Sequence, residues 1–250
     1  VRRRRSPEVV QGRAAAALGD HPVGADTRGG QQTVGRDEPA VLAAADRLLA
    51  AAGVRADWVI PQGCCGATLH DLGAAAAAHE RQSALQSRLA DGDGPVLATD
   101  PHCLSALRAA LVDRPVDALV AHLADLAERG RLPLGGAPTV AYHDPCVLAR
   151  DEHVWAAPRR LLAVAGAGPA EPEGSGGTTV CSGAGMAFDL VDPTTASAVA
   201  ARRAGQLAAV GAPVVTACAR ARQRLEAGGL PVQDLFGFLA SHLVAGQGAS

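Results

Sequence analysis

The sequence predicts an α/β fold built from two repeated units, each with a short, mostly parallel sheet. Three observations carry this prediction. Segments recur at a nearly constant offset, helical and strand-like patterns alternate along the chain, and 48% of the 250 residues are hydrophobic although only 2% are aromatic. A core can therefore be buried, and it must be built mainly from Ala, Val and Leu.

Four segments recur in the same order at offsets of 113 to 118 residues. The matching pairs are 47–53 with 160–166, 64–67 with 181–184, 95–97 with 213–215, and 115–117 with 231–233. The matches that contain Pro-Val or Cys-x-Gly-Ala do not follow from the Ala-rich composition. We therefore expect two units related by a pseudo-two-fold axis, at 37–132 and 138–245. They follow a polar, Gly-rich segment, 1–36, that is expected to be disordered or loosely ordered.

The first unit is expected to open with a helix over residues 39–52, which has apolar side chains at helical spacing and ends before Gly53, a C-cap signal. The strand and cysteine that open the second unit have no counterpart at 28–33, where the offset places them. The other elements expected in this unit are a buried strand at 58–60, a helix at 74–89, a strand at 96–98 and a helix at 104–111.

The second unit is expected to contain strands at 139–142, 178–180 and 214–216. Between the last two, Asp192 and Pro193 form a good N-cap and first-turn pair for a helix that runs to about Val210. Strands that alternate with helices in this way favour α/β layers with parallel strands.

All six cysteines lie at or beside expected strand ends. Ligands of an α/β sheet bind outside the carboxyl ends of its strands, so thiols placed there converge. Neighbouring glycines let the backbone approach a bulky ligand, and thiolate is a preferred ligand of iron–sulfur clusters and zinc. One cysteine is often a small buried hydrophobe, but six at repeat-equivalent turns favour a ligand role. They are Cys64, Cys65, Cys103, Cys146, Cys181 and Cys218.

Four motifs around these cysteines resemble the cysteine-rich CCG domain over roughly residues 39–243. They are Pro-Gln-Gly-Cys-Cys-Gly-Ala at 61–67, Tyr-His-Asp-Pro-Cys at 142–146, Cys-Ser-Gly-Ala-Gly at 181–185 and Thr-Ala-Cys at 216–218. That domain occurs twice in heterodisulfide reductase B. It is also found in the iron–sulfur subunits of glycolate oxidase, lactate utilisation and anaerobic glycerol-3-phosphate dehydrogenase. The resemblance implies an iron–sulfur cluster of the [4Fe-4S] type, held by the six cysteines.

The chain departs from the family pattern at several positions. The lone cysteine of the first unit is absent, Asp100 stands at the first position of its Cys-x-x-Cys turn, and Ser182 and Ala221 replace two cysteines of the second unit. Each unit keeps three thiols, whereas a cubane cluster takes four. Asp100, His102, His143, water or a substrate would complete the set. His143 and Asp144 also have a structural interpretation, in which Asp144 caps the turn before Pro145 and His143 bonds a backbone carbonyl.

The resemblance implies an electron-transfer subunit of an oxidoreductase complex rather than a stand-alone catalyst. Its expected partners are a flavoprotein dehydrogenase subunit and a ferredoxin-type iron–sulfur protein. The ferredoxin run Cys-x-x-Cys-x-x-Cys is missing from this sequence, so we expect it on another chain or on a longer form of this one. Two alternatives stay open: a degenerate scaffold without a cluster, and a structural zinc protein in which thiolates and His or Asp bind the ion.

Charge and hydropathy narrow the remaining function classes. A net charge of −2 argues against a nucleic-acid binder. The basic run at 2–5 is not followed by a long apolar stretch, so it does not match a signal peptide. No window reaches the ~18 apolar residues of a membrane span. We expect a cytoplasmic protein whose contact with a membrane, if it has one, runs through a partner.

Overall fold

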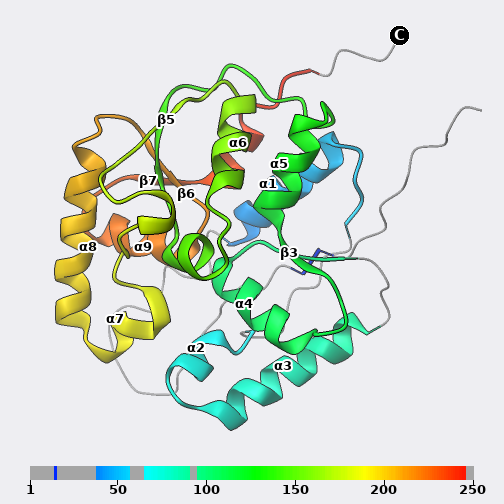
Figure 1. Cartoon of the computed structure of the whole chain (residues 1–250), viewed down its shortest axis with the longest axis vertical. Coiled ribbons are helices and arrows are strands. Elements are labelled where there is room, and N and C mark those ends of the chain that lie inside the picture. Colours follow the sequence, from blue (N-terminus) through cyan, green and yellow to red (C-terminus); the bar gives the residue numbers. More distant parts are fainter. Residues whose placement is uncertain (1–13, 16–37, 57–64, 91–94, 246–250) are drawn as a thin grey trace, which may run out of the picture.

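The computed structural model describes residues 14–15, 38–56, 65–90 and 95–245, and it confirms the α/β class with short parallel strands. The strands form two small sheets, of order β1-β2-β3 and β5-β4-β6-β7, and helices surround both (Figure 1). The strands are β1 (Ala14–Ala15), β2 (Val96–Ala98), β3 (Val116–Ala118), β4 (Val140–His143), β5 (Pro169–Ala170), β6 (Val214–Thr216) and β7 (Val232–Asp234).

The helices agree with the expected ones where the sequence pattern was strongest, namely at 39–52, at 74–89 and after Asp192. Within the described ranges, no helix is long and apolar enough to cross a bilayer. The α-helices are α1 (Glu38–Ala51), α2 (Ala67–Asp71), α3 (Ala75–Leu89), α4 (Pro101–Ala110), α5 (Leu119–Glu128), α6 (Ala156–Val164), α7 (Phe188–Val191), α8 (Pro193–Ala208), α9 (Ala219–Ala227) and α10 (Leu235–Ala240). Three shorter helices are a π-helix, η1 (Val147–Asp151), and two 3₁₀ turns, η2 (Gly176–Thr178) and η3 (Gly185–Ala187).

Capping residues set the starts of the helices that matter for the site. Asp192 accepts a hydrogen bond from the backbone N–H of Thr195 at 3.0 Å and precedes the proline that opens α8, as the sequence predicted. Asp100 does the same for α4, where its carboxylate accepts from the backbone N–H of His102 at 2.9 Å. The start of α4 therefore fixes the position of Asp100, a residue that the sequence singled out as a ligand.

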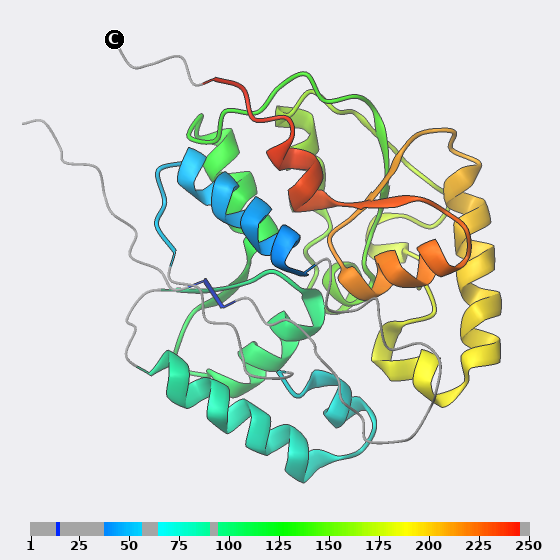
Figure 2. The same cartoon turned by 180° about the vertical axis from the view of Figure 1, so that it is seen from behind.

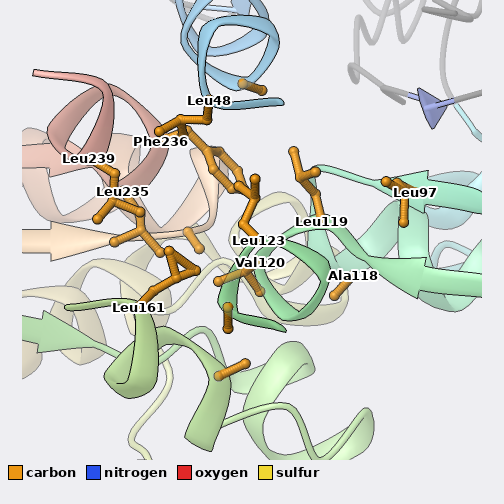
Figure 3. Packing of buried hydrophobic residues seen from close by; sticks show 14 of the residues in the cluster. Leu48, Leu97, Ala118, Leu119, Val120, Leu123, Leu161, Leu235, Phe236 and Leu239 are labelled. Atoms are coloured by element: carbon orange, nitrogen blue, oxygen red, sulfur yellow. The ribbon is translucent and has the colours of Figure 1, made fainter. Parts of the chain in front are cut away.

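The two units share one core because their helices pack reciprocally. The first helix of each unit packs on the last helix of the other: α1 lies against α10 (Figure 2), and α6 lies against α5 (Figure 1). The side chains between them are large and fully buried, among them Leu48, Leu123, Leu161 and Phe236 (Figure 3). This reciprocity is what a pseudo-two-fold relation requires. The superposition of the units, like their bounds at 37–132 and 138–245, stays a prediction.

Equivalent strands also occupy equivalent places in the two sheets. Val96 of β2 pairs in register with Val116 of β3, and Val214 of β6 pairs with Val232 of β7. In the second sheet β4 lies on the other side of β6, and in the first sheet β1 lies on the other side of β2. The strand beside β2 is therefore Ala14–Ala15. The stretch 28–33, the expected strand 58–60 and Cys64 all lie outside the described residues.

The expected strand at 178–180 is wrong: the 3₁₀ turn η2 ends at Thr178, and Thr179 and Val180 belong to no strand. The cause lies in Asp144, at the end of β4. Its carboxylate accepts the backbone N–H of Gly176 at 2.8 Å, and its carbonyl oxygen accepts the hydroxyl of Thr179 at 2.9 Å. These bonds hold the segment against Asp144. The edge position next to β4 is taken instead by β5, at Pro169–Ala170.

A pH dependence of stability is expected from Asp234, which caps α10. Its carboxylate accepts the backbone N–H groups of Phe236 and Gly237 at 2.9 and 3.1 Å, and burial raises its pKa from 3.8 to about 6. A raised pKa in the folded state favours folding below about pH 4, and this contribution is lost as the pH rises through about 6. We expect Asp234→Asn, which keeps the cap, to raise the free energy of unfolding at pH 7.5 by about 1–2 kcal/mol.

Urea denaturation at pH 4 and pH 7.5 measures this effect. The matched control is Asp192→Asn, which changes an exposed cap whose pKa is lowered by its hydrogen bonds to Thr195. The control should gain nothing at pH 7.5. An equal gain in both variants would show that burial of Asp234 is not the cause.

Candidate functional site

The first pair of thiols lies where the chain enters α2 and α4. Cys65 comes two residues before α2, and Cys103 lies in the first turn of α4, after strand β2. The Cys103 thiol donates to the Cys65 sulfur at an Sγ–Sγ distance of 3.2 Å, and both residues are buried. The structure thus brings together two cysteines that are 38 residues apart in sequence. Their expected third member, Cys64, lies outside the described residues.

The second pair lies in the second unit, at positions that are not the repeat equivalents of Cys65 and Cys103, and it is closer to solvent. Cys146 follows β4 and precedes η1, and Cys181 follows the segment that Asp144 holds. Their sulfurs are 3.6 Å apart and both residues are partly buried. A Cβ at Gly185 would lie 3.1 Å from the sulfur of Cys146 and 3.2 Å from that of Cys181, so glycine leaves room beside both sulfurs.

The electrostatics of the second pair favour one thiolate. The hydrogen bond from the Cys146 thiol lowers the pKa of Cys181 from 9.0 to about 5, against the effect of burial, and the backbone N–H groups of Gly185 and Gly183 act in the same direction. The same contact and burial raise the pKa of Cys146. The Gly183 N–H lies 3.3 Å from the Cys181 sulfur. Because thiolate is the form that binds metals, this lowered pKa favours a soft anionic ligand at Cys181.

The glycine that follows each cysteine turn makes the same contact in both units. Gly66 and Gly183 have φ angles of +89° and +88°. A Cβ at Gly66 would lie 2.8 Å from the carbonyl oxygen of Ala78 at the start of α3, and one at Gly183 would overlap the carbonyl oxygen of Ala196 at the start of α8. Both turns therefore press directly on a helix backbone, which only glycine permits.

The sixth cysteine lies in a different set of neighbours. Cys218 caps α9, where its sulfur accepts the backbone N–H of Ala221 at 3.5 Å, and it is buried. Among the described residues, one group of three potential ligands has its ligand atoms within 4.8 Å of one another, and it consists of Cys218, Asp100 and His102. The sequence assigned Cys218 to one set with Cys146 and Cys181. That assignment stays a prediction, while the structure places Cys218 beside two residues of the first unit.

His102 stands at the centre of this group. Its Nδ1 lies 3.2 Å from Oδ1 of Asp100, and its buried Nε2 forms no hydrogen bond of normal geometry with the described residues. Burial lowers the pKa of His102, but interactions with Asp100 and Cys218 raise it well above 6.5. The same ring lowers the pKa of Asp100, against the effect of burial. Sequence reasoning named Asp100 and His102 as ligands but missed that they meet Cys218.

The remaining candidate ligand, His143, accepts a hydrogen bond from the guanidinium of Arg203. It is fully buried, its Nδ1 accepts from Nε of Arg203 at 3.2 Å, and its carbonyl accepts the hydroxyl of Thr216 at 3.0 Å. Burial, and secondarily Arg203, lower its pKa to about 3, so the ring is neutral. A ligand role for His143 stays a prediction. Its neighbour Asp144 does not simply cap a turn: it forms a buried ion pair with Arg159.

Comparisons with known proteins agree with the repeat. The family model described as "CCG: Cysteine-rich domain" matches residues 31–108 and 140–220, one match in each unit. A curated relative from Chromohalobacter salexigens, described as "Probable membrane-anchored ferredoxin", is 32% identical over 143 residues. The match covers 52% of this chain and 21% of the relative, so the chain spans about a fifth of that protein's length.

Proposed function

Because the chain belongs to the cysteine-rich CCG-domain family, whose domain it carries twice, we propose that it binds iron–sulfur clusters and transfers electrons. The observation that carries the proposal is the geometry of the thiols. In both units a cysteine of the Cys-Gly turn meets a second cysteine that follows a strand, at Sγ–Sγ distances of 3.2 and 3.6 Å.

The chemistry of the donors fits an iron–sulfur group. Thiolates are the ligands that hold such clusters. Gly185 leaves space beside Cys146 and Cys181, and the lowered pKa of Cys181 supplies one of the anions. A bound cluster would supply reversible one-electron chemistry. The second unit would hold it through Cys146 and Cys181, and the first through Cys65 and Cys103 together with Cys64, with a non-thiolate ligand at the open position.

The chain's own residues would set how the centres behave. The backbone N–H of Gly183 points at the Cys181 sulfur, and hydrogen bonds of this kind raise the potential of a cluster by stabilising its reduced, more negative state. Cys65 and Cys103 are only 2% and 3% exposed, whereas Cys146 and Cys181 are partly exposed. We infer that electrons enter or leave through the second centre, and that the first is shielded from solvent and oxygen.

The partners follow from the same family assignment. We propose that the protein works as a subunit of an oxidoreductase complex, between a flavoprotein dehydrogenase and a ferredoxin-type iron–sulfur protein, as the resemblance to heterodisulfide reductase B and the glycolate oxidase iron–sulfur proteins implies. The similarity to a probable membrane-anchored ferredoxin supports electron transfer near a membrane. We propose a cytoplasmic location, with a partner providing any membrane contact.

Anaerobic reconstitution with iron and sulfide tests the proposal. The wild type should become brown and retain iron and acid-labile sulfide after desalting. Cys103→Ser and Cys181→Ser should each lower the iron content by about half, since each removes a ligand of one centre. Ala106→Ser in α4 and Ser182→Ala in the second turn are matched controls that should keep full iron content. They change one atom near each centre but leave every thiol in place.

Two results would contradict the proposal in different ways. A colourless protein that retains zinc at both thiol pairs would point to the structural zinc alternative. A folded protein that retains neither metal, with all four variants alike, would point to a scaffold without a cluster.

A further inference from the structure

We propose that Asp100, His102 and Cys218 form a mononuclear Zn²⁺ site that joins the two units. The site shares no ligand with the two thiol pairs, although Cys218 lies near enough to Cys146 to raise the pKa of that thiol, and it does not depend on the iron–sulfur proposal. The potential ligand atoms of the three residues lie within 4.8 Å of one another. Asp100 and His102 come from the start of α4 in the first unit, and Cys218 comes from the start of α9 in the second.

The donor set suits zinc. Carboxylate, imidazole and thiolate are the three protein ligands that Zn²⁺ takes, at about 2.0–2.3 Å. Tetrahedral coordination at those distances puts ligand atoms about 3.4–3.8 Å apart. The upper limit of 4.8 Å in the structure exceeds this by little more than about 1 Å, which side-chain rotation can close.

The histidine ring is already oriented for an ion. Asp100 Oδ1 accepts the backbone N–H of His102 at 2.9 Å and lies 3.2 Å from the ring Nδ1. The contact fixes the tautomer of the imidazole and leaves Nε2 as the donor, while the second oxygen of Asp100, Oδ2, would bind the ion. That Nε2 is buried and forms no well-aligned hydrogen bond within the described part of the chain, and the ring also interacts with the Cys218 side chain. A metal ion bound by both Nε2 and the Cys218 sulfur would satisfy the two groups.

The thiolate side of the site is equally rigid. Cys218 is 5% exposed and caps α9 through the N–H of Ala221. Asp100 caps α4, and the repeat offset of 95–97 with 213–215 makes Asp100 and Cys218 equivalent positions of the two units. The positive ends of both helices therefore meet at the proposed ion and stabilise the anionic forms of its two anionic ligands.

A mostly apolar space lies beside one of the three ligands. A small cavity adjoins Asp100, with Ala98 and Leu104 of the first unit and Ala217 and Phe236 of the second in its lining. Three protein ligands with one position left to water or a small ligand is the composition of an exchangeable zinc site rather than a closed structural one. The ion would connect residues that are far apart in sequence and lock the two units together.

A variant that keeps only Cys218 isolates the proposed site. Replacing Cys64, Cys65, Cys103, Cys146 and Cys181 by Ser removes every thiol of the iron–sulfur proposal. Co²⁺ added to this full-length variant should give a thiolate-to-cobalt charge-transfer band, and one equivalent of Zn²⁺ should abolish it. In this background His102→Ala should weaken Co²⁺ binding about 100-fold, whereas His122→Ala, on α5 and outside the site, should not change it. A folded variant without the band, as judged by circular dichroism, would overturn the proposal.

If the variant with five Cys→Ser substitutions does not fold, the protein with all six cysteines provides a second test. After reconstitution of the clusters, it should contain one Zn²⁺ per chain by mass spectrometry. His102→Ala and Cys218→Ser should each lose that zinc and keep their iron and sulfide. Loss of iron in place of zinc would make these residues cluster ligands, which overturns the zinc site but supports the iron–sulfur proposal. Absence of both metals would contradict both proposals.

Discussion

Gly183→Ala is expected to lower the free energy of unfolding by about 3 kcal/mol or more and to release iron from the second centre. Two penalties add. A side chain at a φ of +88° costs about 1–2 kcal/mol. The new Cβ would also lie well within 3.0 Å of the carbonyl oxygen of Ala196, and overpacking of this kind costs about 1–3 kcal/mol. The backbone atom belongs to α8, so it cannot move aside as a flexible side chain would.

Two other glycines separate the penalties. Gly211 has a φ of +72°, and within the described part of the chain its Cβ would meet no atom closer than 4 Å. Gly211→Ala should therefore cost only the conformational strain, about 1–2 kcal/mol. Gly205 lies inside α8 with open space around it and no positive φ, so Gly205→Ala should stabilise by about 0.5–1 kcal/mol.

Urea denaturation of the three variants, with iron content after reconstitution, measures both effects. If Gly183→Ala costs no more than Gly211→Ala, the contact with α8 has no energetic weight. If it destabilises the chain but keeps full iron, the close approach serves folding and not the site. Gly66→Ala should repeat the Gly183 result in the first unit, because its Cβ would meet the Ala78 carbonyl oxygen at 2.8 Å.

These glycines show where sequence reasoning was right and where it was not. The sequence predicted close backbone approach at the cysteine turns and attributed it to a bulky ligand. The structure assigns that reason to Gly185, beside the two sulfurs, whereas Gly66 and Gly183 make room for a helix. Only the three-dimensional placement of α3 and α8 separates the two causes, since both leave the same residue type in the sequence.

The repeat offset was the most informative signal for the fold. It predicted equivalent strands at 96–98 and 214–216, which the structure confirms as β2 and β6. Although Thr-Thr-Val has strong strand propensity, the strand expected at 178–180 did not form, because the segment hydrogen-bonds to Asp144 instead. Strand propensity depends on the local sequence, whereas the hydrogen-bond partners of a segment are residues that can lie far away in the sequence.

The same limit applies to the candidate site. Thiols after neighbouring parallel strands were expected to converge. Cys65 does meet Cys103 and Cys146 does meet Cys181, but the strand expected before Cys181 is absent and the one expected before Cys65 lies outside the described residues. The meeting of Cys218 with Asp100 depends on how one unit faces the other. Their equivalence in the repeat was visible in the sequence, and residues at equivalent positions can meet near a two-fold axis. To predict this contact, the two-fold relation would have had to be applied to the candidate ligands as well as to the helices and strands.

Asp144→Ala is expected to lower the free energy of unfolding by about 3–5 kcal/mol, the range for breaking a buried ion pair. The carboxylate is 1% exposed, and its oxygens accept from Nη1 and Nη2 of Arg159 at 2.7 and 2.8 Å. The same carboxylate accepts the N–H of Gly176. Without this carboxylate, Arg159 keeps only Glu171 as an ionic partner. The segment that leads to Cys181 also loses its hydrogen bond to the carboxylate. We therefore expect the second centre to lose iron as well.

Glu171→Gln is the matched control for Asp144→Ala, because Glu171 binds the same guanidinium at 2.7 and 2.8 Å but its side chain is 41% exposed. An exposed ion pair contributes about 0–1 kcal/mol, so the control should remain close to the wild type. A double-mutant cycle with Arg159→Ala should give a coupling energy of about 2 kcal/mol or more, since the two groups are within contact distance. Equal small losses in Asp144→Ala and Glu171→Gln would show that burial does not strengthen the pair. The rigidity of the Cys181 segment would then have to come from the hydroxyl of Thr179 and the carbonyl of Asp144, a contact that both substitutions leave intact.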